Sequence, residues 1–472
     1  MKEGRGRLEG ITQETAKGQT RSWRALLPHL ERVNAAARRS GQTRFTALLH
    51  HVDVAALERA FKRQRRAASP GVDRVSVDSY AQDLENNLRR LHDRVHNGQY
   101  WPKPVLRSYI PKADGGRRPL GLPTLEDKIV QGAVAEVLNA IYEVDFLGFS
   151  HGFRPGRSPH TALAVLDRAL MTQKVNWVLD VDIRSFFDSV DHGWLLRMLA
   201  HRIADPRILR LIERWLKAGI LESGRWRMVA EGTPQGSGIS PLLANVFLHY
   251  VFDLWIHQWR RRQARGQVVV CRYADDMVLG FQYEDDARGL LAALDERFGH
   301  FGLALHEGKT RLIEFGRFAA RQREAAGLRR PETFDFLGFT HYCGKTRKGR
   351  FMVKRKTQAK RMTRKLTAIR QEMKARLHRP VKVQHQWLCQ VLRGHYGYYG
   401  VIFNHRSLHA FYEGVKCSWF KALRRRSQKS RMNWQRFDQL LAVYPLPKPV
   451  IHQPWYSVAA GPQVTFQKSP VR

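Results

Sequence analysis

Three aspartates combine residue type and surroundings in a way that suits metal-dependent chemistry. Asp275 and Asp276 are adjacent and separate two apolar runs, Val268–Tyr273 and 277–281, a pattern that predicts a tight β-hairpin with both carboxylates at its tip. The apolar strands cannot solvate the pair, and like charges so close repel each other, so a cation is needed to compensate them. Asp182 lies near the end of a third apolar run, 177–183, and would complete a site for Mg²⁺, a hard cation that binds carboxylate oxygens.

Such a site suits an in-line displacement at a phosphate, in which two metal ions hold the attacking and the leaving oxygen. Taken alone, an Asp-Asp pair in a turn is a solvated turn more often than it is a metal site. The interpretation therefore depends on the rest of the sequence.

The charge distribution predicts a polyanionic partner. The net charge is +39, with 29 Lys/Arg and 3 Asp/Glu after residue 340 and with 52 and 39 before that point. A folded region with such a surplus repels itself unless a polyanion neutralises it, and a surface that only aided solubility would mix both signs. Nucleic acid is the expected polyanion. An anionic membrane is the alternative, but neither a lipidation motif nor an apolar run of about 18–20 residues supports it.

Apolar periodicity and turn residues predict alternating strands and helices. Ser240 followed by Pro241 predicts a helix start with Ser240 as the N-cap. The four cysteines are too far apart in the sequence for a Cys-x-x-Cys metal site, and we expect reduced thiols. The expected strands are 105–111, 177–183, 227–229, 268–273, 277–281, 312–315 and 334–340, and the expected helices are 23–39, 125–142, 185–199, 240–262 and 285–301.

The surroundings of the aspartates resemble a known family. Tyr273-Ala274-Asp275-Asp276 resembles the Y/F-x-D-D box of reverse transcriptases, and DIRSFFD (182–188) resembles the first-aspartate motif of the group II intron-encoded branch. The likeness is dense over residues 65–345 and weaker after them. The further matches, in the family's order, are SPGVD (69–73), RPLGLP (118–123), SHGFRPGRS (150–158), GTPQG (232–236), SPLLAN (240–245), LHEGKT (305–310) and FLGF (336–339).

The resemblance implies an α+β fold of the right-hand polymerase type, with fingers, a palm built on an antiparallel sheet, and an α-helical thumb. It divides the chain into a basic N-terminal extension (1–40), fingers and palm (41–344), a thumb or maturase domain (345–443) and a Pro-rich basic tail (444–472). Many family members continue into a Cys/His-rich HNH endonuclease domain. We expect none here, because the paired cysteines are missing.

The resemblance also implies a catalytic centre. Asp182, Asp275 and Asp276, with the backbone carbonyl of Ile183, would bind two Mg²⁺ ions, or Mn²⁺ in their place. Lys309 matches a lysine proposed as the general acid for pyrophosphate, a role open to a lysine whose neighbours tune its pKa. Simple surface charge is the alternative for Lys309.

The incoming dNTP has its own expected contacts. Arg107, Lys112 and Arg118 match finger residues that hold the triphosphate, and Gln235 matches a residue that contacts the nucleotide's sugar. Phe187 occupies the place of a bulky gate that clashes with a ribose 2′-hydroxyl and so selects dNTPs over rNTPs. The alternatives are a solvated basic hairpin for the three cations, a turn amide for Gln235 and a packed helix residue for Phe187.

Cations at the start of the thumb are spaced as on one face of a helix, and we expect them to contact successive phosphates of a nucleic-acid backbone. They are Lys354, Arg355, Lys356, Lys360, Arg361, Arg364 and Lys365. Of these, Lys354, Lys356, Lys360, Arg361 and Arg364 are our expected RNA contacts.

The expected function is an RNA-directed DNA polymerase that also binds its own group II intron RNA and assists splicing and mobility. Its partners would be an RNA template and primer, dNTPs and a DNA target, without a membrane, in the cytoplasm with the nucleoid or a ribonucleoprotein. Alternatives are an intron-free enzyme with a role in repair or phage defence, and an RNA-binding maturase without catalysis. An RNA-dependent RNA polymerase is disfavoured by Phe187.

Overall fold

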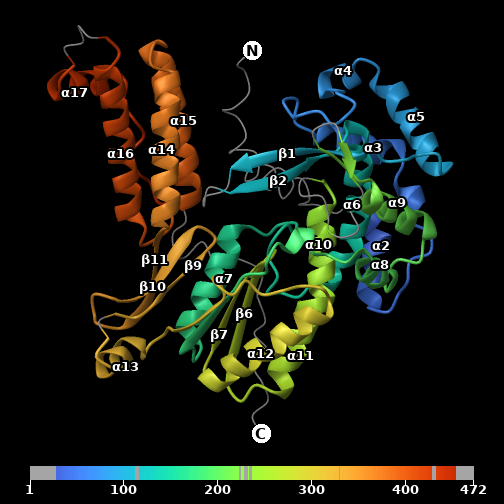
Figure 1. The fold of residues 1–472 in the computed structure, drawn as a ribbon, viewed down its shortest axis with the longest axis horizontal. Helices are drawn as coiled ribbons and strands as arrows, with labels where there is room; N and C mark the ends of the chain where they lie inside the picture. The colour runs from blue at the N-terminus through green and yellow to red at the C-terminus, as the bar shows by residue number, and fades with distance from the viewer. Residues whose placement is uncertain are drawn as a thin grey trace. The chain divides into compact units, whose positions relative to one another are not determined.

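The computed structural model describes residues 28–111, 116–222, 225–227, 232, 237–328, 330–427 and 432–452. These residues form two compact units. One comprises 28–162 and 179–312, and the other comprises 163–178 and 313–452 within those described ranges (Figure 1). Both combine helices with strands, as expected for an α+β protein.

The first unit is built around helix α6, Leu125–Asp145, which is apolar on nearly all sides and largely buried. A helix of this kind must be covered by neighbours, and α2, α3 and α10 pack against it. The Thr124 side chain accepts from the Asp127 backbone N–H and caps its start. The other helices of this region are α2 (Pro28–Arg39), α3 (Val54–Lys62), α4 (Val77–Ala81), α5 (Leu84–His96), α8 (His192–Ala200) and α9 (Pro206–Lys217).

A four-stranded sheet lies beside these helices. Its order is β2-β1-β4-β5, with the β1–β4 pair parallel and the other pairs antiparallel. The strands are β1 (Val105–Pro111), β2 (Arg117–Leu122), β4 (Ile220–Glu222) and β5 (Arg225–Arg227). Of the expected strand 227–229, Arg227 lies in β5, and residues 228 and 229 lie outside the described residues.

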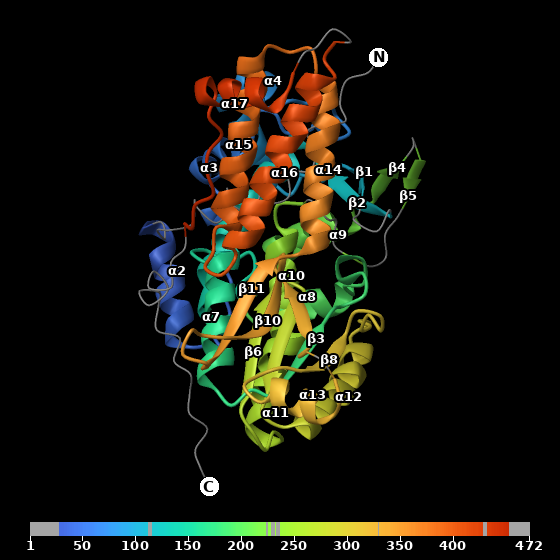
Figure 2. The ribbon, with the colours of Figure 1, turned by 90° about the vertical axis from the view of Figure 1, so that its left-hand side faces the viewer.

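A second four-stranded sheet carries the three aspartates. Its order is β6-β7-β3-β8, and Figure 2 labels β6, β3 and β8. Helix α12, Glu284–His300, packs against β7. The strands are β3 (Trp177–Val181), β6 (Val268–Tyr273), β7 (Asp276–Phe281) and β8 (Arg311–Glu314). The predicted hairpin is therefore confirmed, and β7 starts one residue earlier than expected.

Two expected helices are interrupted. In place of 185–199 there is a 3₁₀ turn, Phe186–Asp188, followed by α8. The cause is local: Ser185 has φ 48°, and Asp191 accepts from the Trp194 backbone N–H and so starts a new helix. In place of 240–262 there are α10 (Ser240–Leu248), a π-helical turn η3 (His249–Asp253) and α11 (Leu254–Arg262).

The expected N-cap is also wrong by one residue. Ser240 is already helical, and Ile239 occupies the cap position without a side-chain hydrogen bond. The position of Pro241 near the start of the helix agrees with the tolerance of the first turn for a residue without N–H.

The second unit contains a three-stranded antiparallel sheet and a group of helices. The expected strand 334–340 is two strands, β9 (Thr333–Phe336) and β10 (Phe339–Lys345), because Leu337 and Gly338 both have positive φ and form a turn. Strand β11, Phe351–Thr357, pairs with β10. The helices are α7 (Pro159–Thr172), which begins in the first unit, α13 (Ala319–Ala325), α14 (Ala359–Ala375), α15 (Val381–Tyr399), α16 (His405–Arg424) and α17 (Trp434–Val443).

Helices α14, α15 and α16 run side by side (Figure 1, Figure 2). Their shared core includes Ile369, Leu392, Phe411 and Trp419, all almost fully buried. Gly414 allows α14 and α16 to approach, because a Cβ at this position would lie 2.9 Å from the Leu366 side chain. None of the helices that the structure describes is long and apolar enough to cross a bilayer, and all four cysteines are free thiols.

Asp205 gives a prediction about stability. This fully buried residue accepts hydrogen bonds from the backbone N–H groups of Leu48 and Leu49 and from Arg207. Burial alone would raise the pKa of the carboxyl, but these hydrogen bonds hold that pKa at about 2. We expect Asp205→Asn to lower the free energy of unfolding by about 1–3 kcal/mol at pH 7.

A depressed carboxyl pKa stabilises the fold above the unfolded-state pKa of about 4 and loses that effect as pH falls towards 2. The difference between the wild type and Asp205→Asn should therefore shrink below pH 4 in urea titrations. Asp295→Asn, on the exposed side of α12, is the control and should change the free energy by less than about 0.5 kcal/mol. A pH-independent difference would contradict the assignment.

Candidate active site

Asp182 follows β3 directly and is held by the segment 304–310. The backbone N–H of His306 donates to the Asp182 carbonyl (2.9 Å), and Arg184 donates from its backbone to Ala304 (2.9 Å). The Lys309 ammonium lies 2.8 Å from Asp182 Oδ2, and the Asp182 side chain is 29% exposed. The carboxylate is therefore fixed at the end of a sheet strand, beside a cation and open to solvent.

Asp275 and Asp276 lie at the turn of the β6–β7 hairpin. Tyr273 and Asp276 are the last paired residues, so Ala274 and Asp275 form a two-residue turn. Ala274 has φ 58°, a left-handed conformation that costs a residue with a Cβ about 1–2 kcal/mol. Asp276 is exposed and Asp275 is half-buried. Burial, and then the charge of Asp276, raises the pKa of Tyr273 to about 12, so the phenol stays neutral.

The strands that carry the aspartates are neighbours, because β7 lies between β6 and β3 in the sheet. The side chains are hard oxygen donors, which fits a divalent ion of the Mg²⁺ type. In the part of the chain that the structure describes, no group of three or more His, Cys, Asp or Glu side chains is placed so that it could hold a metal ion by itself. Mg²⁺ sites commonly use one or two carboxylates together with substrate phosphates, so the donor set fits an ion held jointly with substrate.

The hairpin is anchored from the protein interior by Arg272, which is fully buried. Its Nε and Nη2 donate to the two carboxylate oxygens of Asp253 (2.7 and 2.5 Å). Its Nη1 donates to Asn245 Oδ1 (3.0 Å) and to the Ala274 carbonyl (2.9 Å), and its Nη2 also reaches Ser150 Oγ (2.7 Å). A side chain inside the protein therefore holds the residue immediately before Asp275.

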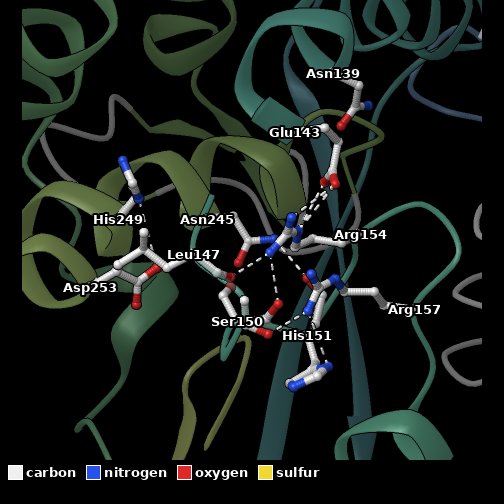
Figure 3. A network of polar contacts seen from close by, with 12 residues as sticks. Asn139, Glu143, Leu147, Ser150, His151, Arg154, Arg157, Asn245, His249 and Asp253 are labelled. Atoms are coloured by element: carbon white, nitrogen blue, oxygen red, sulfur yellow. Dashed lines mark hydrogen bonds and ion pairs between the residues drawn. The ribbon is translucent and has the colours of Figure 1, made fainter. Parts of the chain in front are cut away.

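The loop 146–158 forms a second support. Its backbone pairs with Arg272, through Phe149 O (2.9 Å) and the His151 N–H (2.8 Å). Arg154 holds the loop by donating to the Ser150 carbonyl (2.9 Å) and to the Glu143 carboxylate (3.0 Å). Figure 3 shows Arg154 between Glu143 and Ser150, with Asn245 and Asp253 nearby.

Gly152 lets the hairpin lie on this loop. A Cβ at Gly152 would lie 2.2 Å from the Ala274 nitrogen and 2.9 Å from the Tyr273 carbonyl carbon. The Asn245 side chain donates from Nδ2 to the Gly152 carbonyl (2.7 Å) and accepts at Oδ1 from Arg272 (3.0 Å). The loop, helix α10 and the hairpin are thus joined at one point.

Comparison with known proteins shows which family the region around these aspartates matches. Residues 110–341 match the family model described as reverse transcriptase (RNA-dependent DNA polymerase). These residues are a reverse transcriptase domain. They include every aspartate discussed above, the loop 146–158 and the whole anchoring network.

The relatives of this reverse transcriptase domain include intron proteins. The chain is 38% identical over 242 residues to protein YkfC of Escherichia coli K12, which covers 45% of this chain and 63% of YkfC. It is 40% identical over 184 residues to the group II intron-encoded protein LtrA of Lactococcus lactis, covering 39% of this chain and 30% of LtrA. A 91 kDa protein in the cob intron of Schizosaccharomyces pombe is 45% identical over 148 residues, 31% of this chain and 18% of that protein. The matches thus span less than two thirds of each of these curated relatives.

The nucleotide-contact predictions fall only partly on described residues. Phe187 lies in the 3₁₀ turn after Asp182, half-buried and 5.3 Å from the Phe186 ring in an edge-to-face arrangement. Arg107 lies on β1 opposite Gly121. Arg118 lies on β2, but its side chain is outside the described part, as are Lys112 and Gln235. Ile183 pairs with Leu305 in an isolated bridge.

The predicted thumb cations do not share one helix. Lys354, Arg355 and Lys356 lie on β11, because this segment alternates between buried and outward residues at the period of a strand. Arg355 is buried and lies 3.5 Å from the Asp167 carboxylate, so it does not belong with the outward cations. Lys360, Arg361, Arg364 and Lys365 lie on α14, as predicted for a helix. The role of these cations in RNA binding stays a prediction.

The sequence interpretation did not assign the anchoring residues. A signal was available, since Arg272 interrupts an otherwise apolar strand, and a buried arginine requires a carboxylate partner. The sequence did not show which carboxylate would pair with Arg272, because the π-helical turn is what brings Asp253 to this position.

The close approach at Gly152 gives a prediction. Replacing Gly152 by alanine should displace the hairpin backbone and lower the free energy of unfolding by about 1–3 kcal/mol, the usual range for overpacking against a rigid neighbour. Urea denaturation measures this change. Gly289→Ala is the matched control: it lies in α12 with no atom within 4 Å of an added Cβ and should be neutral or stabilising. Equal effects of the two substitutions would contradict the packing of the hairpin on Gly152.

Proposed function

We propose that this chain is an RNA-directed DNA polymerase of the group II intron type that copies RNA into cDNA. The observation that carries the proposal is the placement of Asp182, Asp275 and Asp276 at the ends of neighbouring strands of one sheet, within a region that matches the reverse transcriptase family. The right-hand arrangement of fingers, palm and thumb is part of the same proposal. The sheet β6-β7-β3-β8 would be the palm, and the helices α14–α17 the thumb.

Two Mg²⁺ ions, or Mn²⁺, would be held by the three aspartates and the Ile183 carbonyl. Bound there, they would activate the primer 3′-hydroxyl and stabilise the leaving pyrophosphate. The protein's own contribution is to hold the carboxylates in place before substrate arrives, so that little reorganisation accompanies the reaction.

Lys309 has a place in this scheme. Its ammonium lies 2.8 Å from Asp182 Oδ2, so it is held next to the proposed metal ligand. From there it could donate a proton to the pyrophosphate as a general acid. Arg107, Lys112 and Arg118 would bind the triphosphate, and Gln235 the sugar.

The nucleic-acid partners follow from charge and family. The outward cations Lys354 and Lys356 on β11, and Lys360, Arg361 and Arg364 on α14, are proposed to contact the phosphates of RNA. That RNA would be a template and primer, and also the intron that encodes the protein, with DNA as the integration target. The proposed location is the cytoplasm, with the nucleoid or a ribonucleoprotein.

The alternative of a maturase without catalysis is supported by the relatives found in introns. The presence of Asp182, Asp275 and Asp276 at the ends of neighbouring strands of one sheet favours catalysis over that alternative. An intron-free enzyme with a host role would share all of this chemistry, and the flanking genomic sequence distinguishes it from an intron protein.

The metal-ligand assignment gives a direct prediction. Asp275→Asn should reduce dNTP incorporation on a poly(rA)/oligo(dT) template by at least about a thousandfold, because a neutral amide cannot replace a carboxylate metal ligand. RNA binding should be almost unchanged. Asp285→Asn, which removes an exposed carboxylate on α12 that pairs with Arg265, is the control and should keep full activity. Synthesis by the Asp275→Asn protein at the wild-type rate would refute the assignment.

The gate role of Phe187 gives a second prediction. Phe187→Val should raise the use of rNTPs relative to dNTPs by about tenfold or more, because the smaller side chain removes the clash with the 2′-hydroxyl. Single-nucleotide incorporation with rNTP and dNTP substrates measures the ratio of kcat/KM values. Phe186→Val is the matched control: Phe186 is buried beside Phe187, so its truncation should destabilise the fold and leave the ratio as in the wild type. An unchanged ratio in Phe187→Val would remove the gate role.

A further inference from the structure

We propose that Arg272 is a positioning residue of the polymerase site, which sets the place of the Asp275 carboxylate through a buried contact with the turn of the hairpin. This inference rests on the proposed function, since the turn that Arg272 holds carries two of the proposed metal ligands. Arg272 itself is fully buried and touches neither metal nor substrate in this scheme.

The guanidinium of Arg272 has all of its donors occupied. An arginine side chain has five N–H groups in a rigid plane. Here they make five hydrogen bonds of 2.5–3.0 Å, to both oxygens of Asp253, to Asn245, to Ser150 and to the Ala274 carbonyl. Four of them fix the guanidinium in the protein interior, and the fifth connects it to the turn.

The π-helical turn explains why Asn245 and Asp253 both reach Arg272. Residues eight apart in a regular α-helix are rotated by about 800°, which places them about 80° apart around the axis. The extra residue of a π-turn removes about 100° of that rotation, so the two side chains point in nearly the same direction. The turn η3, His249–Asp253, follows Asn245 and ends at Asp253, and without it the two side chains would point about 80° apart.

Among the residues that the structure describes, Arg272 and His249 are the basic side chains that lie against the Asp253 carboxylate. His249 lies 3.9 Å from Asp253, but burial lowers the pKa of that histidine to about 4. The imidazole is therefore neutral near pH 7, and Arg272 is the charged partner. In Figure 3 His249 and Asp253 lie beside each other, with Asn245 on the side towards Ser150.

The contact with the Ala274 carbonyl is the one that matters for the site. Ala274 has a left-handed backbone, which costs about 1–2 kcal/mol, and an external contact helps to hold this conformation. The hydrogen bond from Arg272 Nη1 fixes the peptide that leads into Asp275. A change of guanidinium position would therefore move the carboxylate, and misplacement by about 1 Å can cost a hundredfold in rate.

Lysine cannot reproduce this arrangement. Its ammonium keeps the charge but offers three donors from a single point. It could pair with Asp253, yet it could not also reach Asn245, Ser150 and the Ala274 carbonyl. Arg272→Lys therefore tests position while it retains charge, and Asp253→Asn tests the other side of the same pair.

A second buried arginine provides the matched control. Arg202 is 1% exposed, lies 2.9 Å from the Asp145 carboxylate and donates to the Ser40 and Thr43 carbonyls. It shares the chemistry of Arg272 and touches no residue of the hairpin turn. Arg202→Lys should therefore reproduce the loss of stability without the effect on the site.

The experiment uses the full chain with a primer and RNA template. We expect Arg272→Lys to lower kcat for dNTP incorporation at least tenfold, while KM for dNTP stays within about threefold of the wild type. In EPR titrations, the same substitution should raise the Mn²⁺ concentration needed for half-maximal binding at least threefold. Asp253→Asn should lower kcat and weaken Mn²⁺ binding in the same way. The Arg272→Lys/Asp253→Asn double variant should lose less than the product of the single losses, because the two residues act as one pair.

Hydrogen exchange gives a readout that does not depend on activity. The peptide that contains residues 272–277 should exchange at least tenfold faster in Arg272→Lys than in Arg202→Lys. If Arg272→Lys loses stability as Arg202→Lys does, yet keeps the wild-type kcat, Mn²⁺ binding and exchange of this peptide, the inference is overturned. If the wild type itself does not polymerise, the proposed function fails, and the Mn²⁺ titration and the exchange measurement still decide whether Arg272 positions the turn.

Discussion

A guanidinium and a carboxylate, both without solvent contact, are the constraint on which the rest of this site depends. Removing two charges from water is costly, and a hydrophobic pair of similar size is often at least as stabilising. The Arg272–Asp253 pair therefore makes more sense as a source of geometric specificity than of stability. It is fully hydrogen-bonded, which is the condition under which a buried polar network gives one defined arrangement.

This constraint divides the hairpin into two parts with different properties. At Arg272 the strand is fully buried and bonded on both sides, to Phe149 and His151 through the backbone and to helix α10 and η3 through the side chain. A few residues further on, Asp276 is exposed. A rigid base with an open tip is suited to a site that must admit a primer end and a nucleotide and yet keep its carboxylates fixed.

The sequence was informative where structure depends on neighbouring residues. The β6–β7 hairpin was predictable because two apolar runs enclose a turn too short for another connection, and helix α6 because its apolar pattern is long. The interruptions were not predictable. Residues 240–262 have the apolar content of a continuous helix, and nothing in that pattern marks the extra residue of η3.

The sequence also did not show which residues from distant parts of the chain would pair with each other. The cations 354–356 were expected on a basic helix but lie on a strand, and the sequence does not show that Arg355 has a buried partner in Asp167. The same limit applies to Arg272 and Asp253. In both cases composition indicated that a charge was present, whereas its role was fixed by a residue from another element. The three aspartates were recognised because their motifs are local, and the residues that position them were not.

The discontinuity of the second unit has a consequence for how the protein is made. Residues 163–178 belong to this unit, but the rest of it begins at residue 313. A ribosome adds roughly 5–20 residues per second, so α7 leaves the ribosome many seconds before β11 exists. During that interval the Asp167 carboxylate on α7 has no Arg355 with which to pair. This buried ion pair of the second unit can therefore form only after synthesis has passed residue 355, late in translation of the chain.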